Sequence, residues 1–225
     1  MPCGVLGPVL RIRGGTPYII SLRGGDVPGF EPSLDRLHRF LSPLRRYVYR
    51  SSVKVVANSQ ALAKLSIRSD PFPISIVPNG VEERDFFPIV KPVSSCDDSL
   101  SILIASRFHE QKNIPQTIER LARARQHGLQ FKLTLIGDGP ERDRIQKVIM
   151  ANDLVDNVTL VGWLSRSHLA AKLQRADCFV SMSRYEGMPN AILEAMACGV
   201  PVIASGIAAH EEIINDGIDG YLVDL

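Results

Sequence analysis

The chain has 225 residues, 45% of them hydrophobic, and a formal net charge of +2. This length allows one large or two small domains. So small a net charge argues against a dedicated nucleic-acid binder, and no apolar run approaches the about 18–20 residues of a membrane span.

The cysteines and the N-terminal segment indicate a reducing, cytoplasmic location. The cysteines are widely scattered and form no CxxC pair, which disfavours both disulfides and a zinc site. The opening MPCGVLGPVLRIRGG is not typical of a secretory signal, since Pro8 interrupts its apolar run and no basic residue precedes that run.

Basic residues are concentrated near the N-terminus. Residues 1–60 contain nine Arg and Lys against three Asp and Glu. Two interpretations remain open for the basic region 36–54: a solvated helix face, or a peripheral contact with an anionic membrane or an anionic acceptor.

The first part of the chain alternates between short strands and helices. We expect a buried strand over 17–22, and helix over 33–51 that breaks at Ser42-Pro43. A strand over 53–57, a helix capped by Ser59 and a strand over 74–78 follow.

A Pro- and Ser-rich stretch then marks a domain boundary. We expect domains over 1–88 and 100–225, joined by a linker over 89–99.

The second part repeats the strand and helix pattern more regularly. Expected strands cover 100–106, 131–137, 157–162, 178–183, 200–204 and 220–225, and expected helices lie near 115–126, 140–151, 166–175, 191–198 and 210–215. Such alternation, with continuous apolar strands, predicts an α/β fold with a doubly wound parallel sheet.

Glu194 is the most informative single residue. It lies in a helix that is otherwise apolar after Asn190, and Pro189 is expected at the first helical position. A carboxylate is costly to bury without a partner, so Glu194 either faces solvent or faces a ligand that donates hydrogen bonds.

Three loops with unusual polar residues follow strands of the predicted sheet, at the edge where open parallel sheets bind ligands. Arg107 and Lys112 bring cations there, and the turn before the Glu194 helix offers free N–H groups, which together indicate a diphosphate site. Glu194 would lie about 7 Å further along the helix, at the distance of a ribose, and Glu186 would lie at the helix mouth. Taken singly, each of these residues is also compatible with an ordinary surface charge.

Other phosphate-binding patterns are missing from the sequence. It contains neither GxxxxGK[ST] nor a strand-linked GxGxxG.

The stretch EGMPNAILEAMACGVPVIAS resembles the E-x7-E signature of the retaining glycosyltransferases of family 4, the group 1 glycosyltransferases of the GT-B fold. SRFHEQKN, LIGDGPERDRI, VPNGVEERDF and GYLVDL resemble further segments of the same family. The resemblance implies two Rossmann-like doubly wound parallel-sheet domains in a chain that is truncated at both ends relative to the family. Residues 1–88 would be the C-terminal part of the acceptor domain, and residues 100–225 would be the nucleotide-sugar (donor) domain without its last helices.

The resemblance also implies roles for individual residues. Glu186 would stabilise the transferring glycosyl group, and Arg107 and Lys112 would bind the leaving diphosphate. Glu194 would bind the ribose. The remaining donor-binding candidates are Gly187, Met188, Pro189, Asn190 and Gly137. The family uses a nucleotide-diphosphate sugar as co-substrate, and neither a metal nor another cofactor is implied.

The acceptor side departs from the family pattern. Arg23-Gly24 stands where many members carry His-Gly, so Arg23 and Asp26 are the acceptor-side candidates. The implied activity is hexosyl transfer with retention of configuration to a glycan, lipid or small molecule, in the cytoplasm or at the inner face of the membrane. The alternative is a truncated fragment that binds sugar nucleotides without catalysis. A third possible function is that of an epimerase or a phosphorylase of the same fold, but the sequence contains no signature of either.

Overall fold

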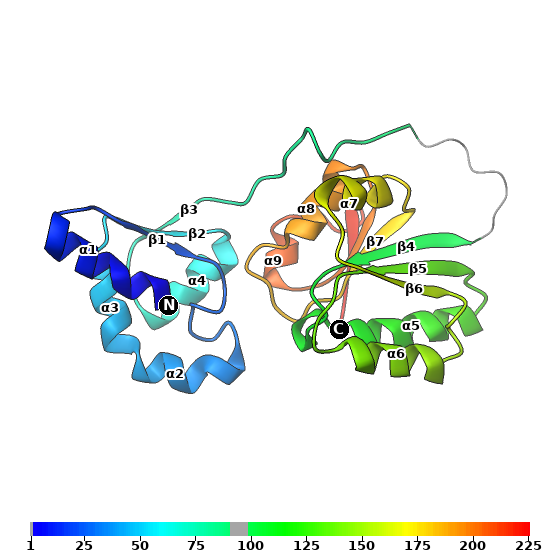
Figure 1. Cartoon of the computed structure of the whole chain (residues 1–225), viewed down its shortest axis with the longest axis horizontal. Coiled ribbons are helices and arrows are strands. Elements are labelled where there is room, and N and C mark those ends of the chain that lie inside the picture. The colour runs from blue at the N-terminus through cyan, green and yellow to red at the C-terminus, as the bar shows by residue number, and fades with distance from the viewer. Residues whose placement is uncertain (1, 91–98) are drawn as a thin grey trace. The chain divides into compact units, whose positions relative to one another are not determined.

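The computed structural model describes residues 2–90 and 99–225, and its contacts divide the chain into two compact units (Figure 1). The first unit comprises Met1–Asn79 together with Tyr185–Met188, and the second comprises Gly80–Arg184 together with Pro189–Leu225. Most of the expected linker, residues 91–98, lies outside the described residues.

The first unit contains a three-stranded parallel sheet in the order β1-β2-β3. Its elements are η1 (Pro2–Val5), α1 (Leu6–Gly14), β1 (Ile19–Leu22), η2 (Pro32–Leu34), α2 (Asp35–Phe40), α3 (Ser42–Ser51), β2 (Lys54–Ala57), α4 (Gln60–Ser69) and β3 (Ile74–Ile76). The predicted helix break is confirmed, since α2 ends at Phe40 and α3 begins at Ser42. The predicted cap is confirmed as well, because the Ser59 hydroxyl accepts a hydrogen bond of 3.1 Å from the Leu62 amide.

Two features of the first unit differ from the sequence expectation. The first strand forms, but it is buried at Leu22 and exposed at Ile19, whereas we expected it to be buried throughout. Its place at the end of the strand order is the reason, since β1 pairs with β2 alone among the described strands. The helix α1 was not anticipated from the sequence, because Pro8 interrupts its apolar run. Pro8 is nevertheless compatible with a first helical turn, where its missing N–H costs no hydrogen bond.

The second unit contains a six-stranded sheet, every strand of which is parallel to its neighbours. Its elements are β4 (Leu100–Ala105), η3 (Glu110–Lys112), α5 (Ile114–Gln126), β5 (Phe131–Ile136), α6 (Arg142–Ala151), β6 (Val158–Gly162), α7 (Arg166–Leu173), β7 (Cys178–Ser181), α8 (Asn190–Ala197), β8 (Val202–Ser205), α9 (Ala208–Glu211) and β9 (Gly220–Val223). The strand order is β6-β5-β4-β7-β8-β9. The predicted α/β fold with parallel sheets is thereby confirmed.

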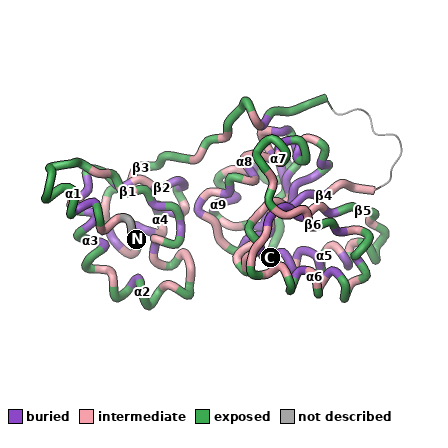
Figure 2. Tube along the Cα trace, in the orientation of Figure 1, coloured by how far each residue is buried: buried purple, intermediate pink, exposed green. Residues whose placement is uncertain are grey.

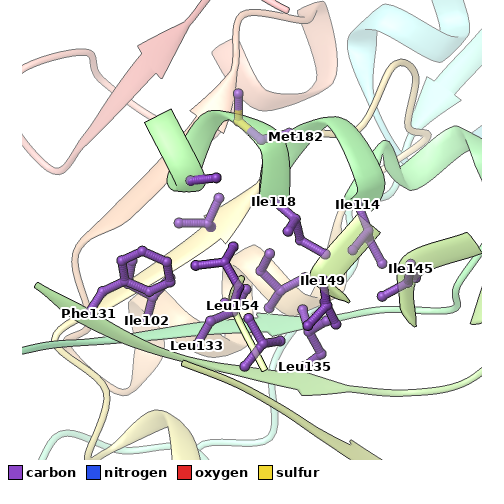
Figure 3. Close-up of a cluster of buried hydrophobic side chains, with 14 of the residues drawn as sticks. Ile102, Ile114, Ile118, Phe131, Leu133, Leu135, Ile145, Ile149, Leu154 and Met182 are labelled. Atoms are coloured by element: carbon purple, nitrogen blue, oxygen red, sulfur yellow. The ribbon is translucent and has the colours of Figure 1, made fainter. Parts of the chain in front are cut away.

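Helices cover both faces of this sheet, as the doubly wound pattern requires. One face packs against α5 and α6, with Ile118 and Ile149 meeting Leu133 in the cluster drawn in Figure 3. The other face packs against α7 and α8, where Leu173 and Ile192 are buried. Because both faces are covered, the inner strands β5, β7 and β8 are buried along most of their length, whereas β6 and β9, at the two ends of the strand order, are buried at their first residue only (Figure 2).

Residues 80–88 belong to the second unit, whereas we expected them to belong to the first domain. Phe86 is the physical reason, since its side chain is buried in the cluster on the α7–α8 face. The Gln174 side-chain amide adds a hydrogen bond of 2.9 Å to the Phe87 carbonyl. Among the described residues, no helix combines the length and the apolar character needed to cross a membrane.

Candidate functional site

The strand order of the second unit reverses between β4 and β7. From β4 the chain continues through β5 and β6 on one side, and from β7 it continues through β8 and β9 on the other. The loops that leave these two adjacent strands therefore diverge, and open α/β sheets bind ligands in the crevice at such a point. These are the loops that carry Arg107, Lys112 and the segment before α8.

The loop from β4 to α5 is compact. The Lys112 amide donates to the His109 carbonyl at 2.8 Å, which closes the single turn η3. Asn113 then takes a left-handed conformation with φ of 55° and is 6% exposed. An asparagine tolerates this conformation better than most residues do, so it turns the chain sharply from η3 into α5.

The loop after β5 is hydrogen-bonded to the loop after β4. The Phe108 amide donates to the Asp138 carbonyl at 2.9 Å, and the Glu141 amide donates to the Phe108 carbonyl at 3.0 Å. The Phe108 side chain is fully buried beneath them. Gly137, the expected donor-binding residue of this loop, is thereby held beside the start of the Arg107 loop.

Arg184 joins the β4 loop to the segment after β7. Its amide donates to the Gln111 carbonyl at 2.9 Å, and its guanidinium donates to Glu110 and to Asn113 at 3.4 Å each. Arg184 was not among the expected site residues, because the partner of an arginine in a loop is evident only when the fold brings the second loop to it.

Glu194 is half-buried on α8. Burial raises its pKa above the ordinary value, because removing a carboxylate from water disfavours its charged form, and the positive charge of Arg166 acts in the opposite direction. Arg166 is the first residue of α7, and its guanidinium lies 4.0 Å from the Asp85 carboxylate. Glu194 is therefore a carboxylate that is partly shielded from water at the predicted ligand edge.

Pro189 differs from its expected place. The helix α8 begins at Asn190, and Pro189 precedes it as the N-cap residue with an extended ψ of 93°. The expectation that Pro189 occupies the first helical position is therefore wrong by one residue. The reason is that the proline ring fixes φ but not ψ, and the extended ψ of Pro189 places it in the turn before the helix.

The expected site residues are distributed between the two units. The second unit holds the cations, the ribose candidate and part of the donor set, namely Arg107, Lys112, Gly137, Pro189, Asn190 and Glu194. The first unit holds Glu186, Gly187 and Met188 together with the acceptor-side candidates Arg23 and Asp26.

Asp26 organises the turn after β1. Its Oδ1 accepts hydrogen bonds from the amides of Arg23 and Gly24, at 3.0 and 2.9 Å. The Arg23 guanidinium donates to the Asn79 side chain at 2.6 Å. Both residues line an open pocket of ≈ 690 Å³ beside β1, whose wall also includes Tyr18 and Leu22. No group of three His, Cys, Asp or Glu side chains placed to hold a metal ion occurs in the part of the chain that the structure describes.

The strand order and its reversal define the second unit as a Rossmann-type α/β domain, a class that binds nucleotides at this edge of the sheet. Residues 99–225 match the family model "Glycosyl transferases group 1", and residues 1–84 match the model "Glycosyltransferase Family 4". The chain belongs to the group 1 glycosyltransferases.

Two curated relatives span nearly the whole chain. It is 29% identical over 214 residues to the N-acetyl-alpha-D-glucosaminyl L-malate synthase of Bacillus anthracis, covering 92% of this chain and 54% of that protein. It is 30% identical over 236 residues to the UDP-Gal:alpha-D-GlcNAc-diphosphoundecaprenol alpha-1,3-galactosyltransferase of Escherichia coli, covering 99% of this chain and 60% of that protein. The chain thus spans little more than half the length of these relatives.

The fold is also that of solved glycosyltransferases. The sucrose-phosphate synthase of Thermosynechococcus elongatus superposes with a TM-score of 0.83 at 24% identity, over 98% of this chain and 58% of that one. The expected GT-B type of fold is thereby confirmed.

Proposed function

We propose that the protein transfers a hexosyl group from a nucleotide-diphosphate sugar to a glycan, lipid or small-molecule acceptor, with retention of configuration. The proposal rests on the residues that lie at the edge of the second sheet where the strand order reverses. There, hydrogen-bonded loops hold Arg107 and Lys112, and α8 begins with Glu194 in its second turn. Cations beside a helix N-terminus suit a diphosphate, and a half-buried carboxylate suits the paired hydroxyls of a ribose.

The reaction breaks the bond between the anomeric carbon and the diphosphate oxygen and forms a bond from that carbon to an acceptor oxygen. Negative charge grows on the departing nucleoside diphosphate, so Arg107 and Lys112 would stabilise the transition state more than the ground state. These two cations are the proposed counter-charges of the diphosphate, and the proposal includes neither a metal ion nor another cofactor. Glu186 would stabilise the positive charge that develops on the transferring sugar.

Retention of configuration places the acceptor on the face from which the diphosphate leaves. The leaving diphosphate oxygen is then the nearest base for the proton of the acceptor hydroxyl. In this scheme the proton ends on the nucleoside diphosphate, and Gly187, Met188, Pro189 and Asn190 line the donor.

The relatives suggest a donor and an acceptor class. The name of the Escherichia coli relative states a UDP-galactose donor and an acceptor sugar carried on diphosphoundecaprenol. By analogy, we propose a UDP-hexose as donor and a lipid-linked sugar as acceptor, in the cytoplasm at the inner face of the membrane. Arg23 and Asp26, in the wall of the pocket beside β1, are the proposed acceptor-side residues.

Nucleotide binding tests the donor site. Calorimetric titration of UDP into the 225-residue chain should show binding that Glu194→Ala weakens at least about tenfold, since hydrogen bonds to a charged group are lost. Glu119→Ala is the matched control, because Glu119 is an exposed glutamate on α5. Equal UDP affinity in wild type and Glu194→Ala would refute the ribose assignment.

Turnover separates transfer from mere binding. In the presence of a UDP-hexose, we expect Glu186→Gln to keep UDP affinity and to lower the release of UDP at least about a hundredfold. Unchanged turnover in this variant would remove Glu186 from the reacting centre. A wild-type chain that binds UDP and turns over no UDP-hexose would favour the second reading, a sugar-nucleotide-binding protein without catalysis.

A further inference from the structure

A buried histidine and a buried serine lie together where β8 leads into α9. Ser205 is the last residue of β8, His210 lies in α9, and both residues are 0% exposed. The His210 Nδ1 atom is 2.8 Å from the Ser205 carbonyl oxygen and 3.2 Å from the Ser205 Oγ atom. Burial of polar side chains is costly unless they form hydrogen bonds, so a pair of this kind holds a defined geometry.

The oxygens of Ser205 determine where His210 carries a proton. A carbonyl oxygen can only accept a hydrogen bond, so Nδ1 must carry the hydrogen and donate it to the Ser205 carbonyl. The Ser205 hydroxyl donates its own hydrogen to the Ser183 carbonyl at 2.5 Å, which leaves its oxygen free to accept from Nδ1. The imidazole therefore orients the Ser205 hydroxyl toward Ser183.

The hydrogen bond from Ser205 to Ser183 joins two neighbouring strands beyond the end of their ladder. The last pair of the ladder between β7 and β8 is Ser181 with Ala204. Past this pair the two chains separate, since β7 leads toward α8 and β8 leads toward α9. The Ser183 carbonyl lies two residues beyond the ladder, and a side-chain hydrogen bond holds it there.

Ser183 begins the segment that carries a candidate catalytic residue, because Glu186 follows it by three residues. The next residue, Arg184, is also held, since its amide donates to the Gln111 carbonyl in the loop after β4 at 2.9 Å. The strands β4, β7 and β8 are neighbours in the sheet. Hydrogen bonds from both neighbouring strands' ends thus fix the backbone at the start of this segment.

A simpler interpretation is that His210 only closes the turn into α9. Main-chain hydrogen bonds already close that turn, because the Ile207 amide donates to the Ser205 carbonyl at 2.8 Å and the His210 amide donates to the Ile207 carbonyl at 2.8 Å. The turn therefore does not need the Ser205 hydroxyl. The atom that this hydroxyl reaches is the Ser183 carbonyl, at the carboxyl end of β7 where the candidate site lies.

We propose that Ser205, oriented by His210, is a positioning residue for the transfer reaction. It holds the Ser183 carbonyl and thereby the course of the chain toward Glu186. The inference rests on the proposed function and deepens it by naming residues that act through Glu186 without touching the substrate. A displacement of about 1 Å can slow an enzymatic step about a hundredfold, so the hydrogen bond should affect turnover more than nucleotide binding.

Hydrogen exchange tests the positioning without any turnover. In Ser205→Ala, the amides of residues 183–188 should exchange at least about tenfold faster than in wild type, because the segment loses its tie to β8. Ser52→Ala is the matched control, since Ser52 is also a buried serine whose hydroxyl donates to a main-chain carbonyl, that of Tyr49, at 2.7 Å. It should leave this segment unchanged. Unchanged exchange in Ser205→Ala would overturn the proposal.

Steady-state turnover of a UDP-hexose tests the consequence for the reaction. Ser205→Ala should lower kcat at least about tenfold, with UDP affinity within about threefold of wild type, because Arg184 keeps its hydrogen bonds to the loop after β4. Ser205→Thr keeps the hydroxyl and should recover most of the lost kcat. A loss of kcat in Ser205→Ala no larger than in Ser52→Ala would refute the positioning role.

Variants of His210 test its part in orienting the hydroxyl. His210→Asn can place an amide N–H where Nδ1–H lies, whereas His210→Leu cannot, so kcat should be higher in His210→Asn. Thermal melts verify that both variants are folded. Equal kcat values in two folded variants would show that His210 does not act through this hydrogen bond.

The two measurements separate this inference from the proposed function. A wild-type chain that releases no UDP from any UDP-hexose would refute the transfer reaction, and exchange over 183–188 would still decide whether Ser205 holds the segment. An active wild type, with Ser205→Ala unchanged in both exchange and kcat, would leave the proposed function standing and refute the positioning role.

Discussion

Gly137 lies so close to Ser106 that a Cβ atom on Gly137 would stand 1.9 Å from the Ser106 carbonyl oxygen. Its φ of +125° is also a conformation that residues with a side chain rarely adopt. The two residues follow β5 and β4, and the Ser106 amide donates to the Ile136 carbonyl at 3.0 Å. Close backbone contact therefore fixes the ends of β4 and β5, two of the three strands whose following loops form the candidate site.

The first prediction concerns this contact. Gly137→Ala should lower the free energy of unfolding by about 3 kcal/mol or more, because the methyl group adds a backbone clash to conformational strain. Urea unfolding measures the effect. Gly128→Ala separates the two contributions, because Gly128 also has a positive φ, of +100°, but has no atom within 4 Å of an added Cβ. Gly137→Ala should lose more unfolding free energy than Gly128→Ala. Equal losses of unfolding free energy would show that the close contact is unimportant.

The second prediction concerns the buried ion pair of the first unit. Asp70 pairs with Arg45 and lies 2.7 Å from Arg46, and the side chains of Arg45 and Asp70 are each 3% exposed. Asp70→Asn should cost about 3–5 kcal/mol of unfolding free energy, because the buried guanidinium of Arg45 loses its counter-charge. Asp156→Asn, in an exposed turn, should change stability little.

The arginines of this group should respond unequally. Arg45→Gln leaves a buried carboxylate poorly compensated, whereas Arg46→Gln removes a side chain that is 53% exposed and should cost about 1 kcal/mol at most. Chemical unfolding of both variants measures the difference. A larger loss in Arg46→Gln than in Arg45→Gln would contradict the assignment of Arg45 as the main partner.

The third prediction is a pH dependence at Glu194, whose pKa burial raises above its ordinary value near 4.5. The folded chain then holds this proton more tightly than the unfolded chain, so stability falls as pH rises from about 4.5 through the raised pKa. Glu194→Gln removes this cost and should be more stable than wild type at about pH 7.5, with the difference vanishing near pH 4. Melting temperatures across this range measure it, with Glu119→Gln as control. A stability difference that does not change with pH would contradict the burial argument.

The fourth prediction concerns Arg184 as a link between loops. Its ion pair with Glu110 is exposed, with side chains 44% and 70% accessible, so Arg184→Gln should cost at most about 1 kcal/mol of stability. UDP affinity should nevertheless fall severalfold, because the loop with Arg107 and Lys112 loses its tie to the segment after β7. Calorimetry and melting of the same samples distinguish the two effects. A lower melting temperature with full UDP affinity would make Arg184 a purely structural residue.

Much of the fold could be predicted from the sequence, because its signals are local. The apolar strands alternate with amphipathic helices. The helix cap at Ser59 and the helix break at Ser42-Pro43 depend only on residues within one helical turn. The spacing of Glu186 and Glu194 and the cations at 107 and 112 also marked the candidate site. The roles of these residues came from family resemblance, and they remain predictions.

Tertiary structure alone decided the rest. Three features of the site join segments that are far apart in the sequence. They are the reversal of strand order between β4 and β7, the contact of Gly137 with Ser106, and the hydrogen bond from Arg184 to Asn113. The exposure of Leu37 and Phe40 belongs here too, since periodicity shows that they share a side of α2 but not whether the core covers it. Local periodicity determines which residues share a face or form a cap, whereas the partner of each face depends on the packing of the whole unit.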